Sequence, residues 1–163
     1  MKPHPQIVLL LNQLAQAFDT RAWHGPNLMG SLRGLDRELA AWRPQPQRHN
    51  IIELVLHAAY WKYRVSRLIS DVSPRSFDLP GSNFFPRHEV PSPEEWRSDL
   101  ELVRDWHARL IAAVDAFDPE RLSQPSGRDT FSFAELIGGA AAHDVYHAGQ
   151  IQLIKRLYAD HEY

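Results

Sequence analysis

The sequence predicts an all-α protein: a four-helix bundle with up-down-down-up order and a long crossover loop between its second and third helices. Three observations favour this class. Four long segments carry apolar residues at three- and four-residue steps, which is the stripe that a bundle helix buries. Three of these segments begin at a capping pattern, and a proline-rich stretch separates the second segment from the third. With 163 residues, the chain is expected to form one domain, 1–163.

The composition narrows the class of function. Hydrophobic residues make up 44% of the chain and charged residues 23%, which is typical of a globular protein. No apolar run approaches the roughly 18 residues of a membrane-spanning helix, so we expect a cytoplasmic protein without a membrane partner. The net charge of −2 and the dispersed basic residues argue against a nucleic-acid partner. Because the chain has no cysteine, any metal site must use histidine, carboxylate or water ligands.

The first long helix and a short one are expected in the N-terminal third of the chain. Residues 5–19 form the long helix, whose apolar stripe consists of Ile7, Leu10, Leu11, Leu14 and Phe18. The connector 20–49 that follows contains leucines at helical spacing, which suggest one short extra helix: Leu28, Leu32, Leu35 and Leu39.

The second long helix is expected to start after Asn50 and to end at about residue 70, because Asn50 and Glu53 resemble a capping box. Residues 71–91 contain four prolines and have no helical periodicity. A twenty-residue helix is about 30 Å long, and an extended chain covers about 3.3 Å per residue. This loop can therefore return along the whole bundle and set the third helix parallel to the second.

The third and fourth helices have the clearest starts. Ser92 is the expected cap of the third helix, with proline at the first helical position and Glu95 completing a capping box. This helix is expected to end at about residue 117. The fourth helix opens at Ser132, has Glu135 as the box partner, and continues almost to the end of the chain.

Three histidines are the main functional candidates. His143 and His147 are four residues apart, so they share one face of the fourth helix, and that face is apolar. His57 lies on the apolar stripe of the second helix. A buried polar group without a partner costs about 2 kcal/mol or more, and one metal ion bound by all three imidazoles removes that cost. Three nitrogen ligands with an open position are typical of catalytic metal sites. The alternative is that all three are core histidines bonded to the backbone or to neighbouring side chains.

The segment from His143 to His147 also invites comparison with the zinc-protease pattern HExxH, in which the acid is the general base. Here the acid is Asp144, which is one methylene shorter. The extended metalloprotease pattern requires a glycine and a histidine at the positions of Gln150 and Leu153. We therefore reject a peptidase.

Two segments of the chain resemble the DinB/YfiT-like superfamily: RHNIIELVLHAAYWKYR, preceded by AAWRP, and HDVYHAGQIQLIKRL near the C-terminus. The resemblance extends over essentially the whole chain. It implies a four-helix bundle, commonly a homodimer, that holds a divalent metal ion through His57, His143 and His147. The ion expected in such a site is zinc, nickel, iron or manganese.

The resemblance leaves the reaction open, because family membership does not fix chemistry. Characterised relatives include transferases and isomerases that use bacillithiol or mycothiol, and many members are described as metal-dependent hydrolases. We therefore expect a metal-dependent enzyme acting on a small molecule, in which the ion activates a low-molecular-weight thiol or water. The alternative is a non-catalytic, metal-stabilised stress or interaction module.

Further residues are candidates to support the ligands or to line a pocket: Glu53, His107 and Gln150, together with Trp42, Trp61, Phe84 and Phe85. His107 lies on an apolar stripe, where a core histidine is the favoured interpretation. Gln150 can hold a ligand or pack between helices, and Glu53 can orient His57 or cap its helix. Asp144 points about 100° away from the ligand face, so solvent or a salt bridge is expected there.

The predicted topology adds one expectation about the mouth of the site. Parallel second and third helices bring the segments 42–50 and 83–93 together above the metal. The residues expected to shape that mouth are Trp42, Arg43, Phe84, Phe85 and Arg87.

Overall fold

The computed structural model describes residues 4–70, 76–127 and 130–161. These residues form helices and no strand, which confirms the all-α class. Parts of two expected loops, residues 71–75 and 128–129, and both chain ends lie outside the described residues. The elements are α1 (Pro5–Phe18), α2 (Leu28–Ser31), α3 (Arg37–Ala41), α4 (Ile51–Ile69), α5 (Pro93–Asp115), a 3-10 turn (Pro119–Arg121) and α6 (Phe133–His161). None of the described helices combines the length and the apolar character that a membrane-spanning segment requires.

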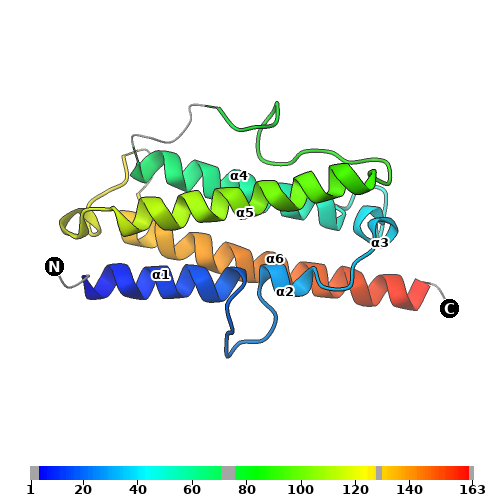
Figure 1. Ribbon diagram of the computed structural model, residues 1–163, viewed down its shortest axis with the longest axis horizontal. Helices are drawn as coiled ribbons and strands as arrows, with labels where there is room; N and C mark the ends of the chain where they lie inside the picture. Colours follow the sequence, from blue (N-terminus) through cyan, green and yellow to red (C-terminus); the bar gives the residue numbers. More distant parts are fainter. Residues whose placement is uncertain (1–3, 71–75, 128–129, 162–163) are drawn as a thin grey trace.

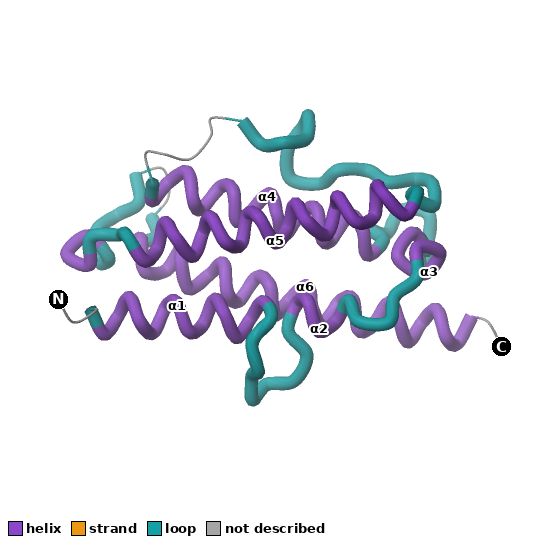
Figure 2. The backbone as a smooth tube through the Cα atoms, viewed as in Figure 1, coloured by secondary structure: helices purple, strands orange, loops and turns teal. Residues whose placement is uncertain are grey.

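The four long helices lie side by side. In Figure 1, α1 and α6 run from left to right, and α4 and α5 run from right to left. Helix α4 packs against both α5 and α6, and α1 packs against α6. The described part of the segment between α4 and α5, residues 76–92, passes over these two helices to the end where α5 begins (Figure 2). Helices α4 and α6 are therefore antiparallel neighbours, which determines which of their residues face each other.

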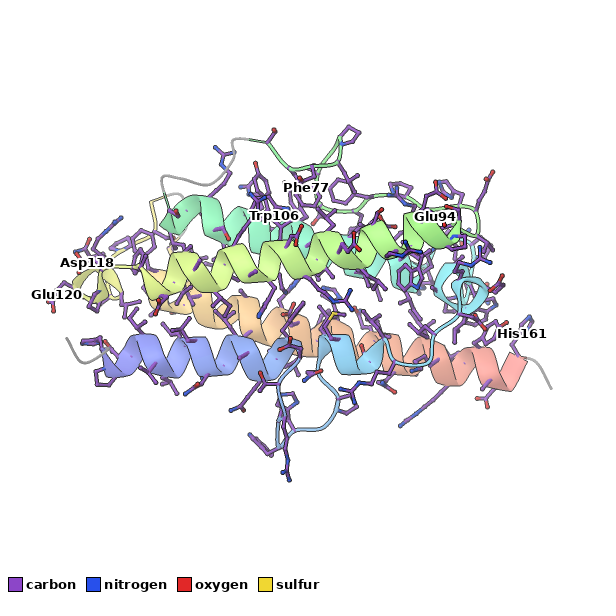
Figure 3. All side chains as sticks on the ribbon, viewed as in Figure 1. Phe77, Glu94, Trp106, Asp118, Glu120 and His161 are labelled. Carbon is purple, nitrogen blue, oxygen red and sulfur yellow. The ribbon has the colours of Figure 1, made fainter. Side chains whose placement is uncertain are left out.

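Aromatic packing attaches the segment 76–92 to the bundle. Phe77 lies beside Trp106 of α5, with ring centroids 6.1 Å apart (Figure 3). The indole Nε1 of Trp106 donates a hydrogen bond to the Asp78 carboxylate at 2.6 Å. Two neighbouring residues of the segment are thus fixed to one buried side chain.

The capping boxes predicted at the starts of α5 and α6 are confirmed. At α5, the Ser92 hydroxyl accepts from the Glu95 N–H at 3.1 Å, and the Glu95 carboxylate accepts from the Ser92 N–H at 2.7 Å. At α6, the same pair of bonds joins Ser132 and Glu135, at 3.3 and 2.7 Å. Both boxes satisfy backbone donors that have no partner inside the helix.

The box predicted at the start of α4 is only half present. The Asn50 side chain accepts from the Glu53 N–H at 2.9 Å, as expected. The Glu53 carboxylate does not return to the cap, because it accepts from the guanidinium of Arg43 and from the N–H of Arg87. A charge-assisted bond to a guanidinium is stronger than a bond to a neutral backbone donor, so Glu53 binds Arg43 and not the backbone N–H of the cap.

The connector contains two short helices instead of the single one predicted. Helix α2 ends at Ser31, and Gly34 then adopts a positive φ of 73°. The Asp36 side chain caps α3 by accepting from the Leu39 N–H at 2.7 Å. The leucine spacing marked the face that packs on the core, but it did not reveal the turn between the helices.

The core consists of two apolar clusters. The first surrounds α4 and includes Leu56, Val103, Trp106 and Ile151. The second joins α1, α5 and α6 with the C-terminal end of α4, through residues that include Leu14, Val65, Leu110 and Ile137. One buried ion pair, between Lys62 and Asp144, links α4 to α6. Asp144 is 0% exposed, so the expected salt bridge is present and the alternative of a solvent-facing side chain is wrong.

Candidate metal centre

Three imidazoles from the neighbouring helices α4 and α6 lie close together. The Nε2 atom of His143 lies 3.1 Å from Nε2 of His57 and 3.0 Å from Nε2 of His147. His57 and His147 are buried, and His143 is half-buried. Within the described residues, these three side chains form a group whose ligand atoms could hold one metal ion. It is the same set that the sequence predicted.

In two of these histidines, the Nδ1 atom, which points away from the other imidazoles, is bound to an oxygen acceptor. His57 Nδ1 donates to the backbone carbonyl of Asn83 at 2.8 Å, and His147 Nδ1 donates to Gln150 Oε1 at 2.6 Å. The Gln150 amide nitrogen donates in turn to the Tyr146 hydroxyl at 3.2 Å, which agrees with its oxygen facing the histidine. A neutral imidazole carries one hydrogen, so both Nε2 atoms present lone pairs to the centre of the group.

The arrangement of nitrogen lone pairs fits a cation. His143 Nε2 carries at most one hydrogen, so it cannot donate to both of the bare nitrogens that face it. Nitrogen ligands about 2.0–2.1 Å from a zinc-like ion, at tetrahedral or octahedral angles, lie about 2.8–3.4 Å apart. The separations of 3.0 and 3.1 Å fall within that span. Imidazole suits zinc, nickel and iron, so the donor set does not select one metal.

Burial keeps these imidazoles neutral. It lowers the pKa of His143 to about 3, and the neighbouring His147, His57 and Lys62 add to the effect. Burial also lowers the pKa of His147 to about 4, although the hydrogen bond to Gln150 opposes the shift. The pKa of His57 is lowered by burial as well, against the bond to Asn83. Metal binding requires the neutral form, so no proton has to leave these residues at neutral pH.

Asn83 positions His57, and no sequence pattern pointed to this residue. Its φ of 66° is in the left-handed region, which asparagine tolerates better than most residues. In this conformation its carbonyl faces His57, while its side-chain oxygen accepts from Trp61 Nε1 at 3.1 Å. The next residue, Phe84, stacks on the His57 ring with centroids 4.0 Å apart. Periodicity gives no signal for such a contact, because Asn83 lies in a loop.

A buried carboxylate holds this loop against α4. Glu53 accepts from Arg43 Nη1 at 3.0 Å, from the Arg87 N–H at 2.9 Å, and contacts His49 Nδ1 at 2.8 Å. Burial by itself raises the pKa of Glu53, but these hydrogen bonds and the charge of Arg43 outweigh it and bring the pKa to about 2. The Asn50 side chain donates to the Arg87 carbonyl at 2.8 Å. The two segments expected at the mouth therefore lie together beside His57.

Three other candidates lie away from the ligands. Trp42 packs against Tyr158 and His161 near the C-terminal end of α6, with ring centroids 5.4 and 5.8 Å apart. Phe85 is buried in the first core cluster. His107 is buried and stacked on Phe18 with centroids 3.8 Å apart, which fits a core histidine, but its Nδ1 atom has no hydrogen-bond partner among the described residues. Burial followed by the charge of Lys62 lowers its pKa to about 3.

A cavity opens beside His143, between α4 and α6. Its volume is about 330 Å³. Its walls include Trp61, Val65 and Leu68 of α4 and Leu136, Gly139 and Ala140 of α6. Trp61 is the sequence-predicted pocket residue that lines it. The ligand group therefore borders a space large enough for a small molecule.

The comparison with known protein families agrees with this geometry. The profile of the DinB superfamily matches residues 20–151, a range that contains all three ligand candidates. No curated protein and no solved structure matches the chain. The match covers well over half of the chain, and it confirms the resemblance carried by the histidine motifs. The chain belongs to the DinB superfamily.

Proposed function

We propose that the chain binds a divalent metal ion through His57, His143 and His147 and uses it in a reaction on a small molecule. The reaction class is transfer of a low-molecular-weight thiol or hydrolysis. The observation that carries the proposal is the convergence of three Nε2 atoms at the edge of a cavity. An ion in this place supplies a Lewis acid that makes a thiol or water nucleophilic at neutral pH.

The chain's own residues support this role by orienting the histidines and by providing an apolar wall. The Asn83 carbonyl and the Gln150 side chain hold the outward nitrogens of His57 and His147, which fixes the tautomer that ligation requires. The Trp61 side chain and Val65 bring apolar surface to the cavity next to His143. A low-dielectric wall strengthens the electrostatic effect of a bound ion on a reacting group.

The frame proposed for this site is a bundle with up-down-down-up order and a crossover between α4 and α5. The directions of the helices in Figure 1 support it. We also propose a homodimer and a cytoplasmic location, and these two proposals rest on the family resemblance and the composition alone.

Metal content tests the proposal directly. We expect untagged protein, purified without added metal, to contain stoichiometric zinc, nickel, iron or manganese by elemental analysis. His143→Ala should remove it, because two ligands remain where three converged. His24→Ala is the matched control at an exposed position and should keep the metal. Equal trace amounts in all three proteins would contradict the proposal.

The non-catalytic alternative has one structural point in its favour. The ligands come from two helices, α4 and α6, so a bound ion would also join those helices. Cobalt substitution separates the two functions, because the visible spectrum of cobalt(II) reports its ligands. A spectrum that changes when a small thiol is added supports the enzyme. A spectrum that stays unchanged at saturating thiol, and also as the pH is raised through the range in which a metal-bound water ionises, supports the metal-stabilised stress or interaction module.

A further inference from the structure

The cavity beside His143 has mainly apolar walls. Besides the residues of α4 and α6 named above, Phe131 borders it, and Gly139 leaves a stretch of wall without a side chain. The lining continues along α4 from Trp61 to Leu68, which is about two helical turns. The ligand group therefore stands at one end of an elongated space, and the body of an occupant must be largely apolar.

Among the described residues, two charged side chains border this space in addition to the neutral His143, namely Arg64 and Glu135. One oxygen of the Glu135 carboxylate, Oε2, is engaged by its own helix start, because it accepts from the Ser132 N–H and hydroxyl, both at 2.7 Å. The Arg64 guanidinium makes one long hydrogen bond, to the Tyr60 hydroxyl at 3.4 Å. Within the part of the chain that the structure describes, Arg64 has no carboxylate partner. A guanidinium has five N–H donors, so most of its donors remain open; Arg64 lines both this cavity and a second pocket beside Tyr60 and Phe77.

We propose that this cavity binds a small, mainly apolar compound whose carboxylate is held by Arg64 and whose other end lies beside His143. Arginine matches a carboxylate with two parallel hydrogen bonds, which gives both affinity and orientation. Arg64 follows His57 by seven residues, about 10 Å along the helix, so the compound has its anionic group remote from the ligand group. Such a compound is a candidate substrate for the proposed metal-dependent function. The role of its end beside His143 rests on that function.

A larger side chain at Gly139 offers a way to fill the cavity without disturbing the fold. A Cβ added at Gly139 would meet nothing within 4 Å, so a larger side chain can extend into the open space. A Cβ added at Gly149, in the same helix, would also meet nothing within 4 Å, and Gly149 does not border the cavity. Leucine at either position changes helix propensity equally, so Gly149→Leu is the matched control for Gly139→Leu.

Binding of two matched probes tests the proposal: 4-phenylbutyrate and the neutral 4-phenyl-1-butanol. Titration calorimetry on the full chain, both as purified and after metal removal, gives the affinity of each probe. We expect the carboxylate to bind about tenfold tighter or more, with or without metal, because a bond to a charged group is stronger than a neutral one. Arg64→Met should remove this preference, and Arg64→Lys should retain part of it. Gly139→Leu should weaken both probes at least tenfold, while Gly149→Leu should bind like the parent.

Several outcomes overturn the proposal. The first two are a carboxylate preference that survives Arg64→Met and a preference that exists only when metal is bound. The others are unchanged probe binding by Gly139→Leu and the failure of both probes to bind the parent. Circular dichroism on each variant verifies that it is folded. Equal trace amounts of metal in the parent and in His143→Ala would contradict the proposed function and leave the metal-free binding results standing, so the two failures are distinguishable.

Discussion

The three ligand candidates differ in what holds their outward nitrogens. His57 is held by a backbone carbonyl and His147 by a side-chain amide, which is itself bonded to Tyr146. A backbone acceptor cannot be removed by changing a side chain, whereas the amide can. The contribution of ligand orientation to metal affinity is therefore measurable at Gln150.

Replacing Gln150 by alanine is expected to weaken metal binding about 10- to 100-fold, which is typical for the loss of a partner that orients a ligand. The His147 ring then loses the acceptor that fixes its tautomer. Competition with a chromophoric chelator measures the change in dissociation constant. Gln152→Ala removes the same side chain two residues further along α6 and should leave the constant unchanged. Equal affinities for the parent and Gln150→Ala would refute a positioning role.

His107 should make the metal-free protein sensitive to acid. Its pKa falls from 6.5 to about 3 in the folded state, because burial and then the charge of Lys62 disfavour the protonated ring. Between these values the unfolded chain binds the extra proton, so the free energy of unfolding decreases as the pH falls from 6.5 towards 3. One such group contributes at most about 1.4 kcal/mol per pH unit.

His107→Phe keeps an aromatic ring against Phe18 and removes the titrating group. We expect a shallower dependence of the unfolding free energy on pH than in the parent, measured by urea denaturation between pH 4 and 6.5 with a chelator present. His88→Phe makes the same change at an exposed position and should keep the parent's slope. Identical slopes for His107→Phe and the parent would show that His107 does not carry the effect.

At the scale of the elements, α4 and α6 are joined by a buried ion pair next to the ligands. Lys62 is 2% exposed and Asp144 is 0% exposed. Burial lowers the pKa of Lys62 and raises the pKa of Asp144, while their mutual attraction opposes both shifts. Asp144 Oδ2 has no hydrogen-bond partner among the described residues. The charge of each buried side chain is therefore compensated by the charge of the other.

Removing one member of this pair is expected to be worse than removing both. Lys62→Met leaves the Asp144 charge uncompensated and should lower the free energy of unfolding by about 3–5 kcal/mol. The double variant Lys62→Met/Asp144→Leu buries apolar side chains in place of the pair and should recover most of that loss. Guanidinium denaturation of the metal-free proteins measures both. A double variant no more stable than the single one would contradict the expected coupling.

At the scale of the whole molecule, local signals predicted the long helices and the ligand set. Ser92 and Ser132 marked two helix starts because a capping box involves residues only three apart. The histidines were identified because an imidazole on an apolar stripe breaks the pattern of its own helix.

Contacts between distant segments were not predictable in this way. The sequence suggests that Glu53 caps its helix or orients His57, whereas its partners Arg43 and Arg87 lie 10 and 34 residues away. Lys62 and Asp144 are 82 residues apart, and each interrupts an apolar face that is visible only once α4 and α6 are packed. The partners of Glu53 and Asp144 were missed for one reason: they come from other elements, so neither propensity nor spacing reports them.

A metal ion bound by residues of α4 and α6 should stabilise the whole bundle, because it binds only when these two helices are packed together. At a free metal concentration 100 times the dissociation constant, the gain is about 2.7 kcal/mol. For a chain of this size, each kcal/mol raises the melting temperature by about 2–4 °C, so we expect a rise of about 5–10 °C on adding zinc to the chelator-treated protein. His57→Ala should lose most of that rise in calorimetry, because its two remaining ligands lie on α6 alone. His88→Ala should keep it, and an equal rise in His57→Ala and the parent would mean that the stabilising ion binds elsewhere.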